Sequence, residues 1–181
     1  CFMDGGFHGF GHSYIPAEIR NEMIPLQDVL RAMSIKKDDV IAEFGAGSGY
    51  YTFLFAKFAR KVYAIESFHE NIKLIMAKGA QNVFAYEADV CSEIPVNDFT
   101  YAFSSSLHDM ECWENLIGKL YEMLPRGGRL AVMEFKPETP FVPPNARIFP
   151  DELDRVAKNA GFFKKGTVDF RYHYLSIFYK Q

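Results

Sequence analysis

A glycine-rich segment at residues 43–49, Glu-Phe-Gly-Ala-Gly-Ser-Gly, has the composition of a loop that could hold a nucleotide-like ligand. It follows an apolar run at residues 39–44 and precedes an aromatic-rich stretch at residues 50–59, so it should join a strand to a helix. Glycine has no Cβ, which lets the backbone turn tightly or approach a ligand closely. The pattern therefore predicts a ligand-binding loop, although glycines used only for tight packing would give the same spacing.

Two acidic residues follow the next two predicted strands. Glu66 ends the strand at residues 61–65, and Asp89 comes shortly after the strand at residues 82–86. Because the carboxyl ends of parallel strands share one edge of a sheet, both carboxylates should lie beside the glycine loop, where acids bind ribose hydroxyls. A dinucleotide fingerprint needs its third glycine at position 50, which is Tyr50 here. The sequence therefore argues against an NAD-dependent oxidoreductase.

Helical and strand patterns alternate along the rest of the chain. Helices are predicted at residues 50–59, 70–78, 113–124 and 150–159, with two short helices within residues 16–33, where Pro25 interrupts the pattern. Strands are predicted at residues 39–44, 61–65, 82–86, 99–104, 129–135, 165–170 and 172–180. No helix separates the last two strands, so they should form an antiparallel hairpin. The expected fold is α/β: a doubly wound, mostly parallel, seven-stranded Rossmann-like sheet with an antiparallel C-terminal hairpin.

The composition fits a single globular domain with little net charge. The 181 residues include 20 Lys or Arg and 23 Asp or Glu, a formal net charge of −3. We expect no nucleic-acid partner, which would need a basic surface, and no membrane span, which needs roughly 18 apolar residues in a row. Residues 79–118 contain no Lys or Arg. This acidic stretch is either a solvated face or the mouth of an active site that disfavours polyanions.

The cysteines and histidines of the sequence do not form a metal or disulfide pattern. Cys1, Cys91 and Cys112 are too few and too scattered to predict a disulfide framework. Reduced thiols and a cytoplasmic location are therefore expected. His8 and His12 have the spacing of a helical metal pair, but the glycines around them disfavour a helix, so no metal site is expected.

Taken together, the loop and the residues after the strands resemble the class I S-adenosylmethionine-dependent methyltransferases. The resemblance rests on the ExGxGxG loop, Glu66, Glu-Ala-Asp-Val at residues 87–90, Leu-Pro-Arg-Gly-Gly-Arg at residues 124–129, and the reversed terminal hairpin. It divides the chain into an amino-terminal arm or helical lid at residues 1–38 and a cofactor-binding domain at residues 39–181. A proline-rich loop at residues 136–150 followed by Pro-Asp-Glu-Leu is similar to the ubiquinone/menaquinone-biosynthesis-like small-molecule branch.

The resemblance implies S-adenosylmethionine as the cofactor and assigns residues to it. The residues at its methionine end would be Glu43, Gly45, Ala46, Gly47, Gly49, Ser104 and Ser105. Glu66, with Ser67 beside it, would hold the ribose hydroxyls. Asp89 would meet the adenine amino group, with Phe68 or Val90 packing near the ring. Alternatively, Asp89 only caps a helix and Phe68 belongs to the core.

The residues after the fourth strand bear on the acceptor. His108 is the candidate general base, which methyl transfer needs only if the acceptor carries a proton with a high pKa; an architectural role is the alternative. Enzymes that methylate base or glutamine amino groups typically carry Asn/Asp-Pro-Pro-Tyr there, whereas residues 104–107 are Ser-Ser-Ser-Leu. The sequence thus predicts methyl transfer to a small-molecule acceptor, at oxygen or carbon. A catalytically idle fold member that binds cofactor or a partner protein is the alternative function.

Overall fold

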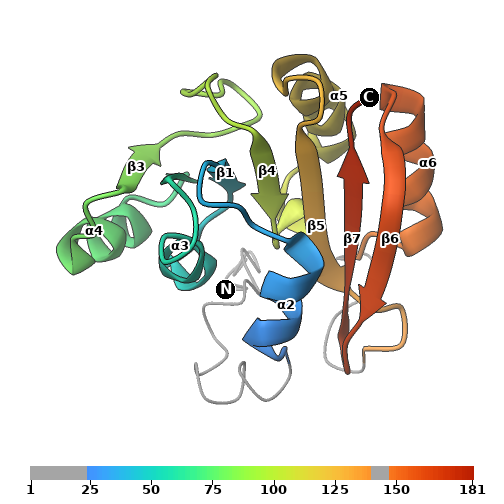
Figure 1. Ribbon diagram of the computed structural model, residues 1–181, viewed down its shortest axis with the longest axis horizontal. Coiled ribbons are helices and arrows are strands. Elements are labelled where there is room, and N and C mark those ends of the chain that lie inside the picture. The colour runs from blue at the N-terminus through green and yellow to red at the C-terminus, as the bar shows by residue number, and fades with distance from the viewer. Residues whose placement is uncertain (1–23, 140–146) are drawn as a thin grey trace, which may run out of the picture.

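The computed structural model describes residues 24–139 and 147–181, which form one α/β unit (Figure 1). Its helices are α2 (Leu26–Met33), α3 (Tyr50–Phe55), α4 (His69–Lys78), α5 (Trp113–Met123) and α6 (Pro150–Ala160), with a short 3-10 helix η2 (Leu107–Asp109). Its strands are β1 (Val40–Phe44), β2 (Lys61–Glu66), β3 (Val83–Glu87), β4 (Tyr101–Ser104), β5 (Arg129–Phe135), β6 (Phe163–Asp169) and β7 (His173–Tyr179). Residues 1–23, which include His8, His12 and one predicted helix, lie outside this description.

A seven-stranded sheet forms the centre of the molecule, in the order β3-β2-β1-β4-β5-β7-β6. Strands β1 to β5 pair in parallel, and β7 runs antiparallel to both β5 and β6. The predicted α/β sheet and its reversed C-terminal hairpin are therefore confirmed. The strand order reverses direction between β1 and β4, and in open α/β sheets the crevice at such a point is where ligands bind.

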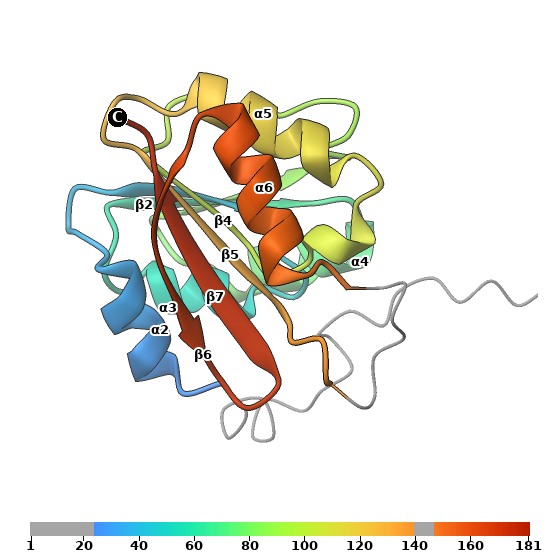
Figure 2. The ribbon, with the colours of Figure 1, turned by 90° about the vertical axis from the view of Figure 1, so that its right-hand side faces the viewer.

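Helices cover both faces of the sheet, so the central strands are apolar on both sides. On one face, Met33 of α2 and Phe55 of α3 pack in one cluster with Ile41 of β1. On the other face, Leu120 of α5 and Val156 of α6 belong to the larger cluster, which α5 and α6 cover. Figure 2 shows α2 and α3 on one side of the strands and α5 and α6 on the other. All five residues of β1 are buried, as a central strand of such a sandwich requires.

Helix α2 is fixed to the sheet through Arg129, at the edge opposite the carboxyl ends. Arg129 at the start of β5 donates to both carboxylate oxygens of Asp39, at 2.5 Å each, and to the backbone oxygens of Met33 and Ser34. The part of segment 1–38 that the structure describes thus packs as a layer of the sheet. A lid role for this segment stays a prediction.

Helix α3 is shorter than the sequence indicates, ending at Phe55 instead of continuing to Ala59. The side-chain amide of Asn82 donates to the backbone oxygens of Ala56 and Ala59, which would otherwise accept from the next helical turn. The backbone N–H of Arg60 donates to Asp39 instead of closing that turn. Tertiary contacts that the local pattern does not contain therefore end this helix.

Strand β6 lies at an edge of the sheet, next to β7 (Figure 1). It is exposed along nearly its whole length, and its pairing with β7 shifts register between Lys164 and Gly166.

No helix in residues 24–139 and 147–181 is long and apolar enough to cross a membrane.

Candidate active site

A cavity of about 530 Å³ lies at the carboxyl edge of the sheet, at the point where the strand order reverses. Its walls come from the loops after four neighbouring strands: Gly45 after β1, residues 65–67 at the end of β2, residues 88–91 after β3, and residues 109–112 with Asn115 after β4. A volume in this range suits a small organic ligand, because such pockets typically measure about 300–1,000 Å³.

The glycine loop takes the tight turn that its sequence predicts. Gly45, Gly47 and Gly49 all have positive φ angles, of 73°, 54° and 84°. The N–H groups of Gly45 and Ala46 donate to the backbone oxygen of Ile65, which holds the loop against β2. Positive φ strains any residue with a Cβ, so this conformation explains why glycine occupies these three positions.

Substituting two of these glycines by alanine should separate strain from steric conflict. A Cβ on Gly45 would lie 2.1 Å from Ser106 Oγ, whereas a Cβ on Gly47 would meet nothing within 4 Å. Both substitutions should cost about 1–2 kcal/mol for the positive φ. Gly45→Ala should cost about 1 kcal/mol more, because Ser106 must give up its hydrogen bond to the Gly45 oxygen. Urea unfolding measures both losses, and equal losses would contradict this packing of Ser106 on the loop.

Glu66 connects the glycine loop to the turn after β2. It is 7% exposed, and its carboxylate accepts from the N–H of Gly47 at 2.7 Å and from the N–H of Phe68 at 2.9 Å. A carboxylate offers about four acceptor sites, so capacity remains for a ligand in the cavity that Glu66 lines. Ser67 lines the same wall, and its hydroxyl donates to the Glu66 carboxylate at 3.4 Å.

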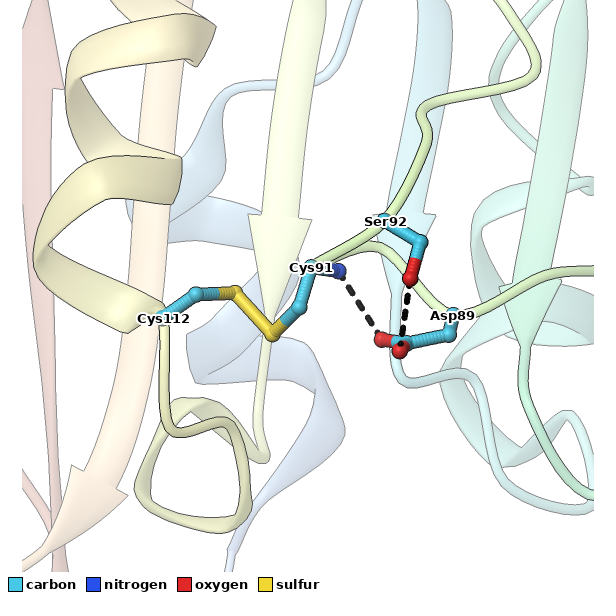
Figure 3. The surroundings of a disulfide bond; sticks show 4 residues. All are labelled: Asp89, Cys91, Ser92 and Cys112. Carbon is cyan, nitrogen blue, oxygen red and sulfur yellow. Dashed lines mark hydrogen bonds between the residues drawn. A yellow bond between two sulfur atoms is a disulfide. The ribbon is translucent and has the colours of Figure 1, made fainter.

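Asp89 organises the turn after β3 and also lines the cavity. Its carboxylate accepts from the N–H of Cys91 at 2.9 Å and from the hydroxyl of Ser92 at 3.1 Å (Figure 3). Asp89 therefore caps a turn and not a helix, and it still lines the cavity. Val90 is buried beside it and lines the cavity as well. Phe68 is 64% exposed and is not part of the core, contrary to the alternative that the sequence left open.

Cys91 and Cys112 form a disulfide in the wall of this cavity (Figure 3). The expectation of reduced thiols is wrong for this pair. Their separation of 21 residues gives no sequence signal, but the fold brings the loop after β3 beside the start of α5, where Cys112 is the residue before the helix. A cytoplasmic location, which was expected together with reduced thiols, stays a prediction.

Of the residues predicted for the methionine end, Gly45 lines this cavity. The others lie at the ends of β1 and β4 and in the glycine loop, outside its wall. Ser104 pairs with Phe44 in the sheet, and its hydroxyl donates to the Phe44 oxygen at 2.8 Å. Ser104 and Ser105 are both buried. Glu43 accepts a hydrogen bond from the Thr52 hydroxyl, and burial raises the pKa of the Glu43 carboxyl to about 8. Ala46, Gly47 and Gly49 follow in the loop, outside the wall.

His108 lies beside a buried acid that the sequence analysis did not identify. Its ring nitrogen Nδ1 is 2.6 Å from Glu134 Oε2, and its backbone N–H donates to the other oxygen of Glu134. Both side chains are almost fully buried, at 3% and 0% exposed. The sequence does contain a signal for this pair: Glu134 is the single acid in the apolar strand Arg129–Phe135, and a buried carboxylate needs a partner.

The pair with Glu134 keeps His108 protonated at neutral pH. Burial of the ring opposes the charge, but the charge and hydrogen bond of Glu134 outweigh burial and raise the pKa of His108 to about 9. The folded protein then retains a proton that the unfolded chain loses above the ordinary histidine pKa of 6.5. This arrangement favours a charged imidazolium over a proton acceptor.

The stability of the protein should consequently depend on pH through His108. Relative to His108→Gln, the free energy of unfolding of the wild type should fall as pH rises from about 6.5 to about 9, because the stabilising charge is lost there. Glu43 also has a raised pKa and titrates in this pH range, but it is present in both proteins. The difference between their free energies of unfolding therefore removes its contribution. Denaturant unfolding across this pH range measures it, and a pH-independent difference would show that His108 carries no bound proton.

Comparison with known proteins identifies the class that this fold and cavity define. Residues 42–132, half of the chain, match the family model of the methyltransferase domain. The chain belongs to this family and is an S-adenosylmethionine-dependent methyltransferase. The prediction of the family is thereby confirmed, and the ubiquinone-like branch is compatible with it. No curated protein sequence matches the chain.

Several solved structures have a similar fold. A SAM-dependent methyltransferase from Aquifex aeolicus is 21% identical, with a TM-score of 0.80 over 88% of this chain and 91% of that one. One from Mesorhizobium loti is 15% identical, with a TM-score of 0.73 over 88% and 99% of the two chains. The 1,6-didemethyltoxoflavin-N1-methyltransferase of Burkholderia thailandensis, solved with S-adenosylhomocysteine, is 17% identical, with a TM-score of 0.71 over 88% and 78%. At these identities the likeness concerns the fold.

Proposed function

We propose that this methyltransferase acts on a small-molecule acceptor, at oxygen or carbon in preference to nitrogen. The observation that carries the proposal is the charge of the cavity. Four carboxylates line it, from Glu66, Asp89, Asp109 and Glu111, and none of its lining residues is Lys or Arg. Such a wall repels phosphate groups, so a nucleic acid is a poor substrate.

The cofactor fits the cavity by the chemistry of its walls. Glu66 has free acceptor sites for the ribose hydroxyls, and Asp89 and Val90 lie where the adenine amino group and ring would bind. The turned backbone of residues 45–49, with Glu43, Ser104 and Ser105 beyond it, would surround the methionine end. When bound, the cofactor supplies an electrophilic methyl group. The protein then has to align the acceptor and exclude water, which provides most of the acceleration.

The hydroxyls after β4 support the preference for oxygen or carbon. Ser104 donates to the backbone oxygen of Phe44, and Ser106 donates to that of Gly45. These side chains hold the glycine loop to the end of β4, and residues 104–107 contain no side-chain carbonyl that could accept a hydrogen bond from the N–H of an acceptor amine.

We propose that His108 acts as a positioning residue instead of the general base expected from the sequence. Its ion pair with Glu134 fixes η2, the turn that carries Asp109 and Met110 to the cavity. His108→Gln should then raise the KM for the cofactor, while the pH dependence of kcat keeps its wild-type shape. Loss of one ionisation from the kcat profile, with an unchanged KM, would instead identify His108 as the base.

A transfer assay with methyl-labelled S-adenosylmethionine tests the acceptor class. Panels of phenols, quinols and enolisable carbon acids should accept label, whereas aliphatic amines, tRNA and oligonucleotides should not. Methylation of a nucleic acid, or of amines alone, would overturn the proposal. Labelled acceptor and S-adenosylhomocysteine should form in equal amounts, since transfer of the methyl group to water gives S-adenosylhomocysteine without labelled acceptor.

A further inference from the structure

The disulfide joins two segments that the sheet alone does not connect. Cys91 follows Asp89 and Val90 in the turn after β3, and Cys112 ends the segment 109–112 that forms the facing part of the wall. Figure 3 shows the bond spanning from this turn to the start of α5. The bond therefore links the residues placed at the adenine with the wall that faces them.

Hydrogen bonds of the turn do not duplicate this link. The carboxylate and backbone oxygen of Asp89 accept from Cys91, Ser92 and Glu93, all within the turn itself. In the part of the chain that the structure describes, no hydrogen bond joins segment 109–112 to this turn: Met110 N–H donates to Leu107, Trp113 N–H donates to Met110, and η2 is held to β5 through His108 and Glu134. The covalent bond and apolar packing are what hold the two segments together.

The disulfide is also reachable from a second side. A hollow of about 560 Å³ between α5 and α6 is lined by Cys91 and Cys112 as well, together with Lys119 and Arg155. The cystine thus separates this hollow from the cofactor cavity. Both cysteines are only half-buried. A small dithiol can approach the sulfur atoms from the α5–α6 side without entering the cofactor cavity.

We propose that the Cys91–Cys112 disulfide positions the adenine side of the cofactor cavity, so that its reduction weakens cofactor binding and leaves the transfer step unchanged. This inference rests on the proposed placement of the adenosyl half in the cavity. In the reduction, a dithiol supplies two electrons and two protons and becomes a disulfide, the Cys91–Cys112 bond breaks, and two thiols form. Two thiols need more space than one S–S bond, so the turn and α5 move apart.

Calorimetric titration with S-adenosylhomocysteine before and after treatment with dithiothreitol tests the proposal. The dissociation constant should rise at least about tenfold on reduction, within the usual range for coupled sites. Cys91→Ser and Cys112→Ser should each bind as weakly as the reduced wild type and should not respond to dithiothreitol. The KM for S-adenosylmethionine should rise in parallel, with kcat unchanged. If the bond is purely structural, its reduction should lower the melting temperature and leave the dissociation constant and the KM unchanged.

A second measurement avoids variants altogether. Because coupling is reciprocal, saturating S-adenosylhomocysteine should make the disulfide harder to reduce by the same factor, measured as the thiol fraction in dithiothreitol redox buffers. Equal dissociation constants in both redox states would overturn the proposal while leaving the cofactor site intact. Free thiols in protein purified without reductant would also overturn it. If Glu66→Ala and Asp89→Ala bind as tightly as the wild type, the placement of the adenosyl half itself is wrong.

Discussion

Replacing Glu66 by alanine should weaken binding of S-adenosylhomocysteine by at least about 100-fold. In the proposed binding mode the carboxylate accepts from the ribose hydroxyls, and a hydrogen bond to a charged group contributes about 1.5–3 kcal/mol. Two such bonds correspond to about 3 kcal/mol or more, at 1.4 kcal/mol for each factor of ten. The substitution also removes the acceptor of the Gly47 and Phe68 N–H groups, so the loop loses its fixed position.

Thermal unfolding with and without ligand measures this loss. Ligand at about 100 times the wild-type dissociation constant should add about 2.7 kcal/mol to the stability of the wild type. That corresponds to a rise of several degrees, at about 2–4 °C for each kcal/mol in a chain of this size. Glu66→Ala should show almost no rise at the same concentration.

Glu87→Ala is the matched control for this experiment. Glu87 pairs with Glu66 in the register of β2 and β3, but it is half-exposed, bonded to His69, and outside the cavity wall. It should keep the full ligand-induced rise. If the two variants behave alike, Glu66 does not hold the cofactor.

Replacing Glu134 by alanine should have the largest effect on stability. The substitution removes the closer and fully buried carboxylate partner of His108, leaving only the half-exposed Asp109 at 3.7 Å from Nε2, and breaking a buried ion pair costs about 3–5 kcal/mol. The melting temperature should fall by about 10 °C, at 2–4 °C for each kcal/mol. Differential scanning calorimetry at pH 7 measures the change.

The chain contains an exposed pair of the same chemistry for comparison. His69 Nδ1 lies 2.6 Å from Glu87 Oε2, the same distance as in the buried pair, but the two side chains are 59% and 50% exposed. Glu87→Ala should therefore cost no more than about 1 kcal/mol. The double variant His108→Leu with Glu134→Leu should recover most of the loss, because an apolar pair leaves no buried charge. A loss in the double variant as large as in Glu134→Ala would assign the effect to packing.

The sequence predicts the fold well because the order of strand and helix patterns along the chain determines it. The central strands are apolar runs of their own, and the absence of a helix between β6 and β7 is sufficient to predict the antiparallel hairpin. Gly45, Glu66 and Asp89 could be placed together for the same reason, since each directly follows a strand and parallel strands end at one edge.

The features that the sequence does not reveal all depend on contacts between distant segments. Cys91 and Cys112 meet only because the loop after β3 and the start of α5 flank one cavity. Glu134 has no local partner; its partner His108 comes from the neighbouring strand's loop. The early end of α3 depends on Asn82, which is far along the chain. Periodicity describes one element at a time and carries no information on these pairs.

Strand β6, at the edge of the sheet, affects whether molecules associate edge to edge at high concentration. An outermost strand offers unpaired N–H and C=O groups, to which a strand of another molecule can add. Here the shift in pairing between Lys164 and Gly166 makes that row irregular, and the exposed Lys165 places positive charge beside it, next to Lys164, which is paired with Asp154. A second copy approaching this border would meet a bent backbone and like charges. Both features oppose the growth of the sheet from one molecule into the next.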